Sequence, residues 1–390
     1  MRNSLLLATL SALSINLLLS TETQAHASTP STCKAFPHDS ITRWATGEEG
    51  VIQPANPLSQ KLSRWLVDYE EAFSQQKLKR NVALKAESTH CRLTLSYYDQ
   101  NEQLSLRWQW TAKAGADGQW LIDLPLQANT NTWKTQRIGA VTYHFENSLN
   151  TTRAQRFATK YANIAETFQQ EVEAIDFYIV DDYQHFLSLV GIDFSAKYQN
   201  NRRDGYGIVA NTIFSVMQDP DFSHDTVHYY AAKVHSQRNW PAEEGVAYLW
   251  GNAYYTNKQA YAADYPEMMQ ALLELVEDKK QQGEPIDWLR WWQDNPKAFF
   301  AETTTNAPNM APETSIRALI SAMLCEQVWQ QHGIKGLKQL MNAGRGEAAF
   351  FAAIESTLGI SSKNFNQRLD SIINQYRSAL ESAITNKTLH

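Results

Sequence analysis

The sequence is short of long apolar segments, of cysteine and of surplus basic charge. Beyond the first 27 residues, no run approaches the ~20 apolar residues of a membrane-spanning helix, so we expect no stable membrane span. The 35 Lys and Arg against 41 Asp and Glu give a net charge of -6, which argues against nucleic acid as a partner. The Gly-x-Ser-x-Gly motif of serine hydrolases and the glycine-rich loops of dinucleotide and phosphate sites are also absent.

Residues 1–27 have the features of a secretory signal peptide. Arg2 provides the positive start, residues 5–19 form a mostly apolar run, and Ala25-His26-Ala27 offers a cleavage site between small residues. The run is short and interrupted by serine and asparagine, which disfavours a membrane anchor. We therefore expect an exported protein, periplasmic or secreted, in a compartment that permits a disulfide.

The three cysteines divide into a pair and a single residue. Cys33 and Cys91 both lie in the N-terminal third, and we expect them to form a disulfide. Cys325 lies in an apolar helical stretch and is interpreted as a buried free thiol. No neighbouring residue supplies a base, which disfavours a catalytic role for this cysteine.

The part after the signal peptide starts with a change of periodicity. Residues 58–84 have the apolar spacing of a helix. The segments that follow alternate or are rich in β-branched and aromatic residues, with turn signals between them, and they are predicted to be strands: residues 92–98, 103–111, 119–124 and 137–145. A small domain over residues 28–140, with a helix and an antiparallel sheet, is therefore expected, and the fold class is α+β.

The rest of the chain is mostly helical by its apolar spacing. Two strands are predicted, at residues 176–180 and 205–214. Asp219-Pro220 has the residue types that open a helix, and this helix is expected to run to about Ser236. The other predicted helices cover residues 154–173, 182–190, 241–254, 265–281, 285–294, 312–332, 334–341, 347–357 and 362–384.

The residues that point to chemistry are two histidines on the predicted helix after Asp219. His224 and His228 are four residues apart, so their side chains lie on one helix face and can reach one cation. A catalytic zinc needs three protein ligands and an open position. A second helix that returns antiparallel would bring the carboxylates of Glu243 and Glu244 back towards this pair.

This pattern resembles a known family. HDTVH followed by PAEEGVAYLW is similar to the gluzincin (peptidase MA) pattern of HExxH and a later Glu-Gly-x-Ala helix, and the likeness covers about residues 140–380. The resemblance implies a zincin-like metal-binding domain over residues 141–256 and a helical C-terminal domain over residues 257–390. It implies Zn2+ as cofactor, with His224, His228 and Glu244 as ligands. Gly245 matches the glycine after the family's ligand glutamate, so Glu243 is the fallback third ligand.

The sequence departs from the family at the general base, where Asp225 replaces glutamate. The aspartate keeps a carboxylate but is one methylene shorter. A base that lies ~1 Å too far from the water it must deprotonate can lower the rate about a hundredfold. The resemblance predicts an exported zinc peptidase that acts on peptides or proteins with Asp225 as base. The alternatives are a weakly active or inactive zincin-like domain that binds peptide or zinc in the cell envelope, and a metal-free scaffold with structural histidines.

Several further residues are candidates without an assigned role. In the family, a Tyr or His on a helix stabilises the oxyanion of the reaction. The corresponding helix of this sequence has neither residue, and the candidate substitutes are Tyr229, Tyr254, Tyr255 and Tyr261. The absent Gly-x-Met-Glu-Asn motif disfavours an aminopeptidase. His235 is too far from His228 along the helix to share an ion, about 10 Å. The tryptophans of residues 288–292 either line a subsite or pack between helices.

Overall fold

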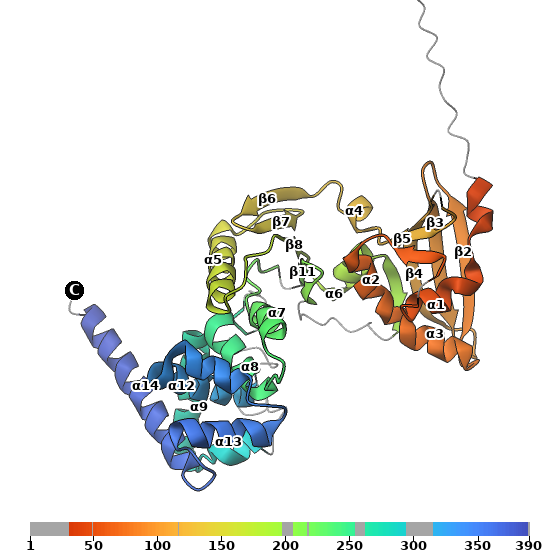
Figure 1. The fold of residues 1–390 in the computed structure, drawn as a ribbon. Coiled ribbons are helices and arrows are strands. Elements are labelled where there is room, and N and C mark those ends of the chain that lie inside the picture. The colour runs from red at the N-terminus through yellow and green to blue at the C-terminus, as the bar shows by residue number, and fades with distance from the viewer. Residues whose placement is uncertain are drawn as a thin grey trace, which may run out of the picture.

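The computed structural model describes residues 31–388, apart from residues 49, 116, 197–205, 217, 254–261 and 294–314. Two sheets and a group of helices follow one another along the chain, and Figure 1 shows the first sheet and the last helices at opposite ends of the molecule. The predicted α+β class, with an N-terminal sheet region and a helical C-terminal part, is confirmed.

The first sheet has six strands and a short helical lead-in. Its strands are β1 (Ile52–Pro54), β2 (Lys79–Ala86), β3 (Cys91–Tyr98), β4 (Leu104–Ala114), β5 (Trp120–Asp123) and β9 (Ile192–Ser195). Their order is β1-β5-β4-β3-β2, and β9 pairs with β4. The helices that accompany the sheet are α1 (Ile41–Ala45), α2 (Pro57–Ser63), α3 (Val67–Ser74) and α4 (Leu126–Asn129). The predicted Cys33–Cys91 disulfide is confirmed and ties the lead-in to the start of β3.

The second sheet is mixed and has the order β10-β11-β8-β7-β6. Its strands are β6 (Lys134–Ile138), β7 (Val141–Phe145), β8 (Ile175–Ile179), β10 (Tyr206–Val209) and β11 (Thr212–Ser215). On one face, Phe177 packs against Phe157 of α5 (Thr151–Thr167), with the ring centroids 5.2 Å apart. On the other face, Tyr178 and Phe214 join the core of the first sheet, together with α6 (Tyr183–Leu189). The alternating side chains of β8 thus connect the two cores.

The C-terminal part is a cluster of helices built around the longest one. Its members are α7 (His224–Val234), α8 (Trp240–Val246), the π-helix η5 (Ala247–Gly251), α9 (Tyr265–Gln281), α10 (Trp288–Gln293), α12 (Ile316–Met341), α13 (Glu347–Leu358) and α14 (Phe365–Thr388). Helix α12 is kinked at Gly333, where the backbone leaves helical geometry. None of the helices in the described part of the chain has both the length and the apolar character needed to cross a bilayer.

Some predicted elements have the wrong bounds or type, and one of them carries the candidate site. The helix predicted to open at Asp219 begins instead at His224, because residues 219–223 form a loop pinned by ion pairs. The helix predicted over residues 58–84 ends at Ser74, and Lys79–Ala86 pairs with β3 as a strand instead. Each of the strands predicted at residues 137–145 and 205–214 is a hairpin.

The two hairpins were missed because their turns are short. One turns at residues 139–140, where Gly139 has a φ of +59°. The other turns at Ala210 and Asn211, which both have positive φ, as a tight two-residue hairpin requires. The boundary expected near residue 140 falls in the first of these turns.

Candidate metal centre

The histidine pair lies at the start of α7. His224 is the first residue of the helix and His228 follows one turn later, so the two rings lie on one face as the spacing predicts. Their Nε2 atoms are 3.2 Å apart. His224 is 7% exposed, and the His228 side chain is also largely buried.

Helix α8 returns beside α7 and brings Glu244 to the pair. One Glu244 oxygen lies 3.2 Å from His228 Nε2, and the other lies 3.5 Å from His224 Nε2. Ligand atoms that sit ~2.0–2.1 Å from a tetrahedral zinc stand roughly 3.3 Å from one another. The closest approaches among the three predicted ligands are near this spacing, with a different Glu244 oxygen facing each histidine. Among the described residues the three form one of two groups that could hold a metal, because one ligand atom of each lies within 4.8 Å of the others.

The second imidazole nitrogens fix the orientation of both rings. His224 Nδ1 donates to the backbone carbonyl of Asn252 at 2.9 Å, and His228 Nδ1 donates to Glu243 Oε1 at 2.7 Å. Because a carbonyl and an ionised carboxylate can only accept, both rings carry a proton on Nδ1. Nε2 is therefore the nitrogen of each ring that is left to bind a metal, as in metal sites whose histidines are held by outer hydrogen bonds.

Glu243, the fallback ligand, lies behind the site instead of in it. Its side chain is fully buried and is held by Arg238, whose Nε donates to Oε2 at 2.8 Å. Burial works to raise the pKa of the Glu243 carboxyl, but the hydrogen bonds from Arg238 and His228 outweigh it and lower the pKa below its ordinary value. Glu243 is therefore an ionised partner that orients His228.

The loop before α7 is held by charges from one face of α5. Arg153 makes a bidentate ion pair with the buried Asp219, at 2.7 and 2.6 Å. Arg156 donates to the buried Asp221 at 2.7 Å. Bidentate, buried pairs of this kind fix geometry more firmly than exposed ones. Within this loop, Asp221 also accepts a hydrogen bond from Asn252, so the loop and the end of η5 are joined.

Two side chains contact His224 from the π-helix η5 and the residue directly after it. Tyr248 stands edge-on to the His224 ring with 5.6 Å between ring centroids, and Asn252 Oδ1 accepts from the His224 backbone N–H at 3.1 Å. A Cβ on Gly251 would lie only 2.8 Å from His224 Cα, so this approach requires glycine. Single π turns of this type are frequent at functional sites.

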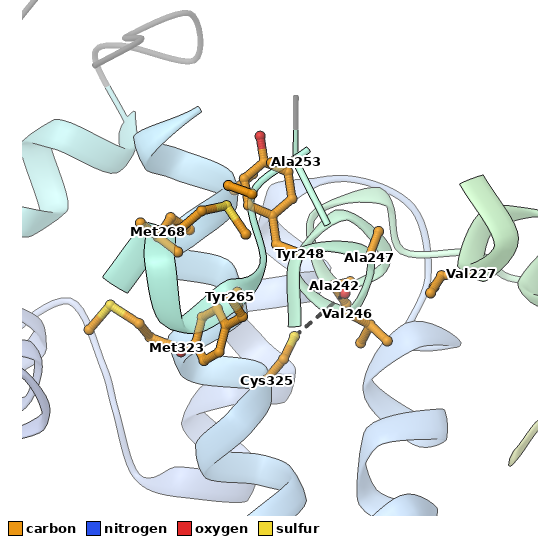
Figure 2. Close-up of a cluster of buried hydrophobic side chains, with 14 of the residues drawn as sticks. Val227, Ala242, Val246, Ala247, Tyr248, Ala253, Tyr265, Met268, Met323 and Cys325 are labelled. Carbon is orange, nitrogen blue, oxygen red and sulfur yellow. Dashed lines mark hydrogen bonds between the residues drawn. The ribbon is translucent and has the colours of Figure 1, made fainter. Parts of the chain in front are cut away.

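Glycine also sets the position of Glu244. A Cβ on Gly245 would lie 2.7 Å from the carbonyl carbon of Ser321 and 2.9 Å from Cys325 Sγ. Figure 2 shows Cys325 of α12 directed at α8, where its thiol contacts the carbonyl oxygen of Ala242 at 3.5 Å. The close contact of α8 with α12 thus explains the glycine after Glu244, and Cys325 is the buried free thiol that was predicted.

Asp225, the predicted base, follows His224 and lies beside the ligand group but outside it. Burial raises the pKa of its carboxyl, and Glu244 adds to the rise against the lowering effect of the two histidines. No hydrogen bond or ion pair engages the Asp225 carboxyl among the described residues. The carboxyl is thus available to accept a proton next to the site.

The charges around His228 favour a cation between the three groups. Burial works to lower the pKa of the imidazole, but the hydrogen bonds to Glu243 and Glu244 outweigh it and raise the pKa to about 10. The pKa of Glu244 is lowered, since the interactions with His228 and His224 outweigh the effect of its burial. A proton on His228 thus occupies the place where a metal dication would balance the same carboxylates.

Other candidates lie elsewhere. The Tyr229 hydroxyl lies within hydrogen-bonding distance of Glu173 and, at 3.0 Å, of Asn211 Oδ1, and neither residue belongs to the ligand group. Tyr254, Tyr255 and Tyr261 lie outside the described residues. His235 contacts Phe168 at the end of α7. Trp288 and Trp292 are fully buried between helices.

The second possible metal group is looser. His185 Nε2 lies 4.0 Å from Glu146, and His185 Nδ1 lies 3.9 Å from Asp181. Both carboxylates are about half exposed. Such spacing and exposure are common for surface charges, so this group is a weaker candidate than the first.

Three contributors to the candidate centre were missed by the sequence reasoning. They are Asn252, Tyr248 and Trp240, whose indole is stacked on the His228 ring. The four-residue spacing of Glu244 and Tyr248 on a common helix could have indicated the second of these. No protein-family model, curated protein or solved structure matches the chain, so its function is inferred from this geometry.

Proposed function

We propose that this protein is an exported zinc-dependent peptidase whose metal is held by His224, His228 and Glu244. The observation that carries the proposal is the convergence of these three groups, whose closest ligand-atom distances are 3.2 to 3.5 Å. Two imidazoles and one carboxylate suit zinc better than calcium or magnesium, which prefer oxygen ligands. Three protein ligands leave the fourth position for water, as in catalytic zinc sites.

The residues of the chain supply orientation and proton transfer. A bound zinc ion supplies Lewis acidity, which lowers the pKa of water and polarises the scissile carbonyl. Asp225 is the group that would accept the water proton and deliver it to the leaving amine, and the raised pKa of its carboxyl suits that task. Glu243 and the carbonyl of Asn252 keep the imidazoles in the tautomer that presents Nε2.

Two features support export. The first 27 residues match a signal peptide, and the Cys33–Cys91 disulfide is typical of proteins that fold in an oxidising compartment. A peptide or protein substrate, rather than nucleic acid, agrees with the net charge of -6.

The second candidate function is a zinc- or peptide-binding domain that cleaves weakly or not at all. It is favoured by one observation: the position after the first histidine holds the short carboxylate of Asp225, where the gluzincin pattern has glutamate. A base that falls ~1 Å short loses about a hundredfold in rate.

Substitution of Asp225 decides between the two candidates. If the enzyme is active as it stands, zinc-loaded wild type cleaves denatured casein, and Asp225→Asn lowers the rate by at least a hundredfold with zinc content unchanged. If the domain only binds, zinc-loaded wild type is inert, and Asp225→Glu, which extends the carboxylate, creates cleavage. Inertness of wild type and Asp225→Glu with zinc present would reject the peptidase.

A further inference from the structure

Trp240 places an exposed indole directly beside the candidate metal centre. It is the first residue of α8, and its ring lies on the His228 ring with 4.8 Å between centroids and 9° between planes. At 56% it is also the most exposed large apolar side chain in the described part of the chain. One indole face therefore covers a proposed ligand, and much of the rest of the side chain is open to solvent.

The backbone that carries Trp240 is firmly anchored. The preceding residue, Asn239, is fully buried and caps α8 by accepting from the Ala242 N–H at 3.1 Å. The Asn239 side chain also donates to the carbonyl of Gly344 at 2.7 Å, and its backbone N–H donates to Met341 at 2.8 Å. The exposed ring thus extends from a fixed point, and fixed aromatic side chains bind ligands with little loss of conformational entropy.

We propose that Trp240 is a specificity-determining residue that binds an aromatic side chain next to the scissile bond of the substrate. This inference rests on the proposed zinc peptidase function. Because the indole is stacked on the ring of His228, a proposed metal ligand, a side chain that flanks a carbonyl bound at this centre would lie next to the indole. Aromatic rings pair at centroid distances of about 4.5–7 Å in stacked or edge-on geometry, and an exposed indole offers both.

Small hydroxamates test this without requiring cleavage, because a hydroxamate binds zinc directly. The probes are N-acetyl-phenylalanine hydroxamate and N-acetyl-alanine hydroxamate, titrated calorimetrically into the zinc-loaded full chain. We expect wild type to bind the phenylalanine compound about tenfold more tightly. Trp240→Ala should reduce this preference to below about threefold, and Trp240→Phe should keep it. The control is Trp329→Ala, which removes another exposed tryptophan, 44% exposed on α12, and should keep the wild-type preference.

The outcomes separate the two proposals. Zinc-loaded protein with equal affinity for both probes, or with an unchanged preference in Trp240→Ala, overturns the role of Trp240 and leaves the metal site standing. Tighter binding of a third probe, N-acetyl-arginine hydroxamate, than of the phenylalanine compound overturns the aromatic substrate class. Failure of the wild type to take up zinc overturns the proposed function, and the inference with it.

Discussion

His228 and Glu243 form a hydrogen-bonded pair in which a buried carboxylate holds Nδ1 of the imidazole, 2.7 Å away. The adjacent residue Glu244 contacts the other nitrogen of the same ring at 3.2 Å. Two consecutive glutamates therefore hold the two nitrogens of one histidine. In the proposed centre the first glutamate positions the ring and the second shares the metal with it.

Removing the positioning carboxylate should weaken the metal site without abolishing it. We expect Glu243→Ala to lower zinc affinity about 10- to 100-fold, as loss of an outer hydrogen-bond partner typically does. Glu243→Gln keeps an acceptor for Nδ1–H and should lose less. Competition with a chromogenic chelator measures both constants. Equal zinc affinity in wild type and Glu243→Ala would contradict the assigned role.

Zinc affinity should continue to rise with pH above neutrality. The raised pKa of His228, about 10 without metal, means that zinc must displace a proton at any pH below that value. Raising the pH removes this competition, so affinity should increase about tenfold per pH unit between pH 7 and 8.5. Titration calorimetry in buffers of different ionisation enthalpy should detect the released proton. A pH-independent affinity over that interval would argue against protonated His228.

The same shift affects the stability of the metal-free protein. The folded pKa lies above the ordinary value of 6.5, so the stabilisation from protonated His228 is complete below pH 6.5 and is lost as the pH rises towards 10. We expect the melting temperature of the metal-free protein to fall across this interval, and to fall less in His228→Gln. The same change of melting temperature with pH in wild type and His228→Gln would contradict this.

The two glycines at the centre should not tolerate a methyl group. Gly245→Ala and Gly251→Ala each create contacts below 3.0 Å with neighbouring backbone atoms, and we expect each to cost about 1–3 kcal/mol of stability. Because Gly251 abuts His224, its substitution should also weaken zinc binding. Gly50→Ala is the matched control, since nothing lies within 4 Å of the added carbon. Denaturant unfolding and chelator competition provide the measurements.

The disulfide should stabilise the N-terminal part without influencing the metal. Cys33 and Cys91 are 58 residues apart, and the chain-entropy treatment of such a loop gives about 4 kcal/mol. We expect the double substitution of both cysteines by serine to lower the melting temperature and to leave zinc stoichiometry unchanged. Loss of zinc in this variant would show that the disulfide supports the centre as well.

Much of the candidate centre could be anticipated from the sequence because its spacing is local. The i, i+4 relation of His224 and His228 needs only a helix, and Glu244 follows from a helical hairpin. Gly245 matched a family pattern, and the structure adds a packing reason for it. The choice of Glu244 over Glu243 as the expected third ligand also rested on that glycine.

The rest depended on long-range contacts that no local pattern encodes. Asn252, at the end of the π-helix η5, contacts the backbone of His224. Arg153 of α5 forms an ion pair with Asp219, so residues 219–223 form a loop and α7 begins at His224 instead of at Asp219. The strand at Lys79–Ala86 forms because β3 pairs with it along its full length, although local spacing favoured a helix. The turn at Ala210 and Asn211 lacks the glycine that usually marks a tight hairpin.

The most direct test of the account is the metal content of the purified full chain after zinc loading and removal of excess metal. The account predicts one zinc ion per wild-type chain, measured by elemental mass spectrometry. His224→Ala, His228→Ala and Glu244→Ala should each fall well below half an equivalent, while His185→Ala, in the looser second group, should retain a full equivalent. Wild-type protein without stoichiometric zinc, or an equal zinc content in His224→Ala, would contradict the proposed centre.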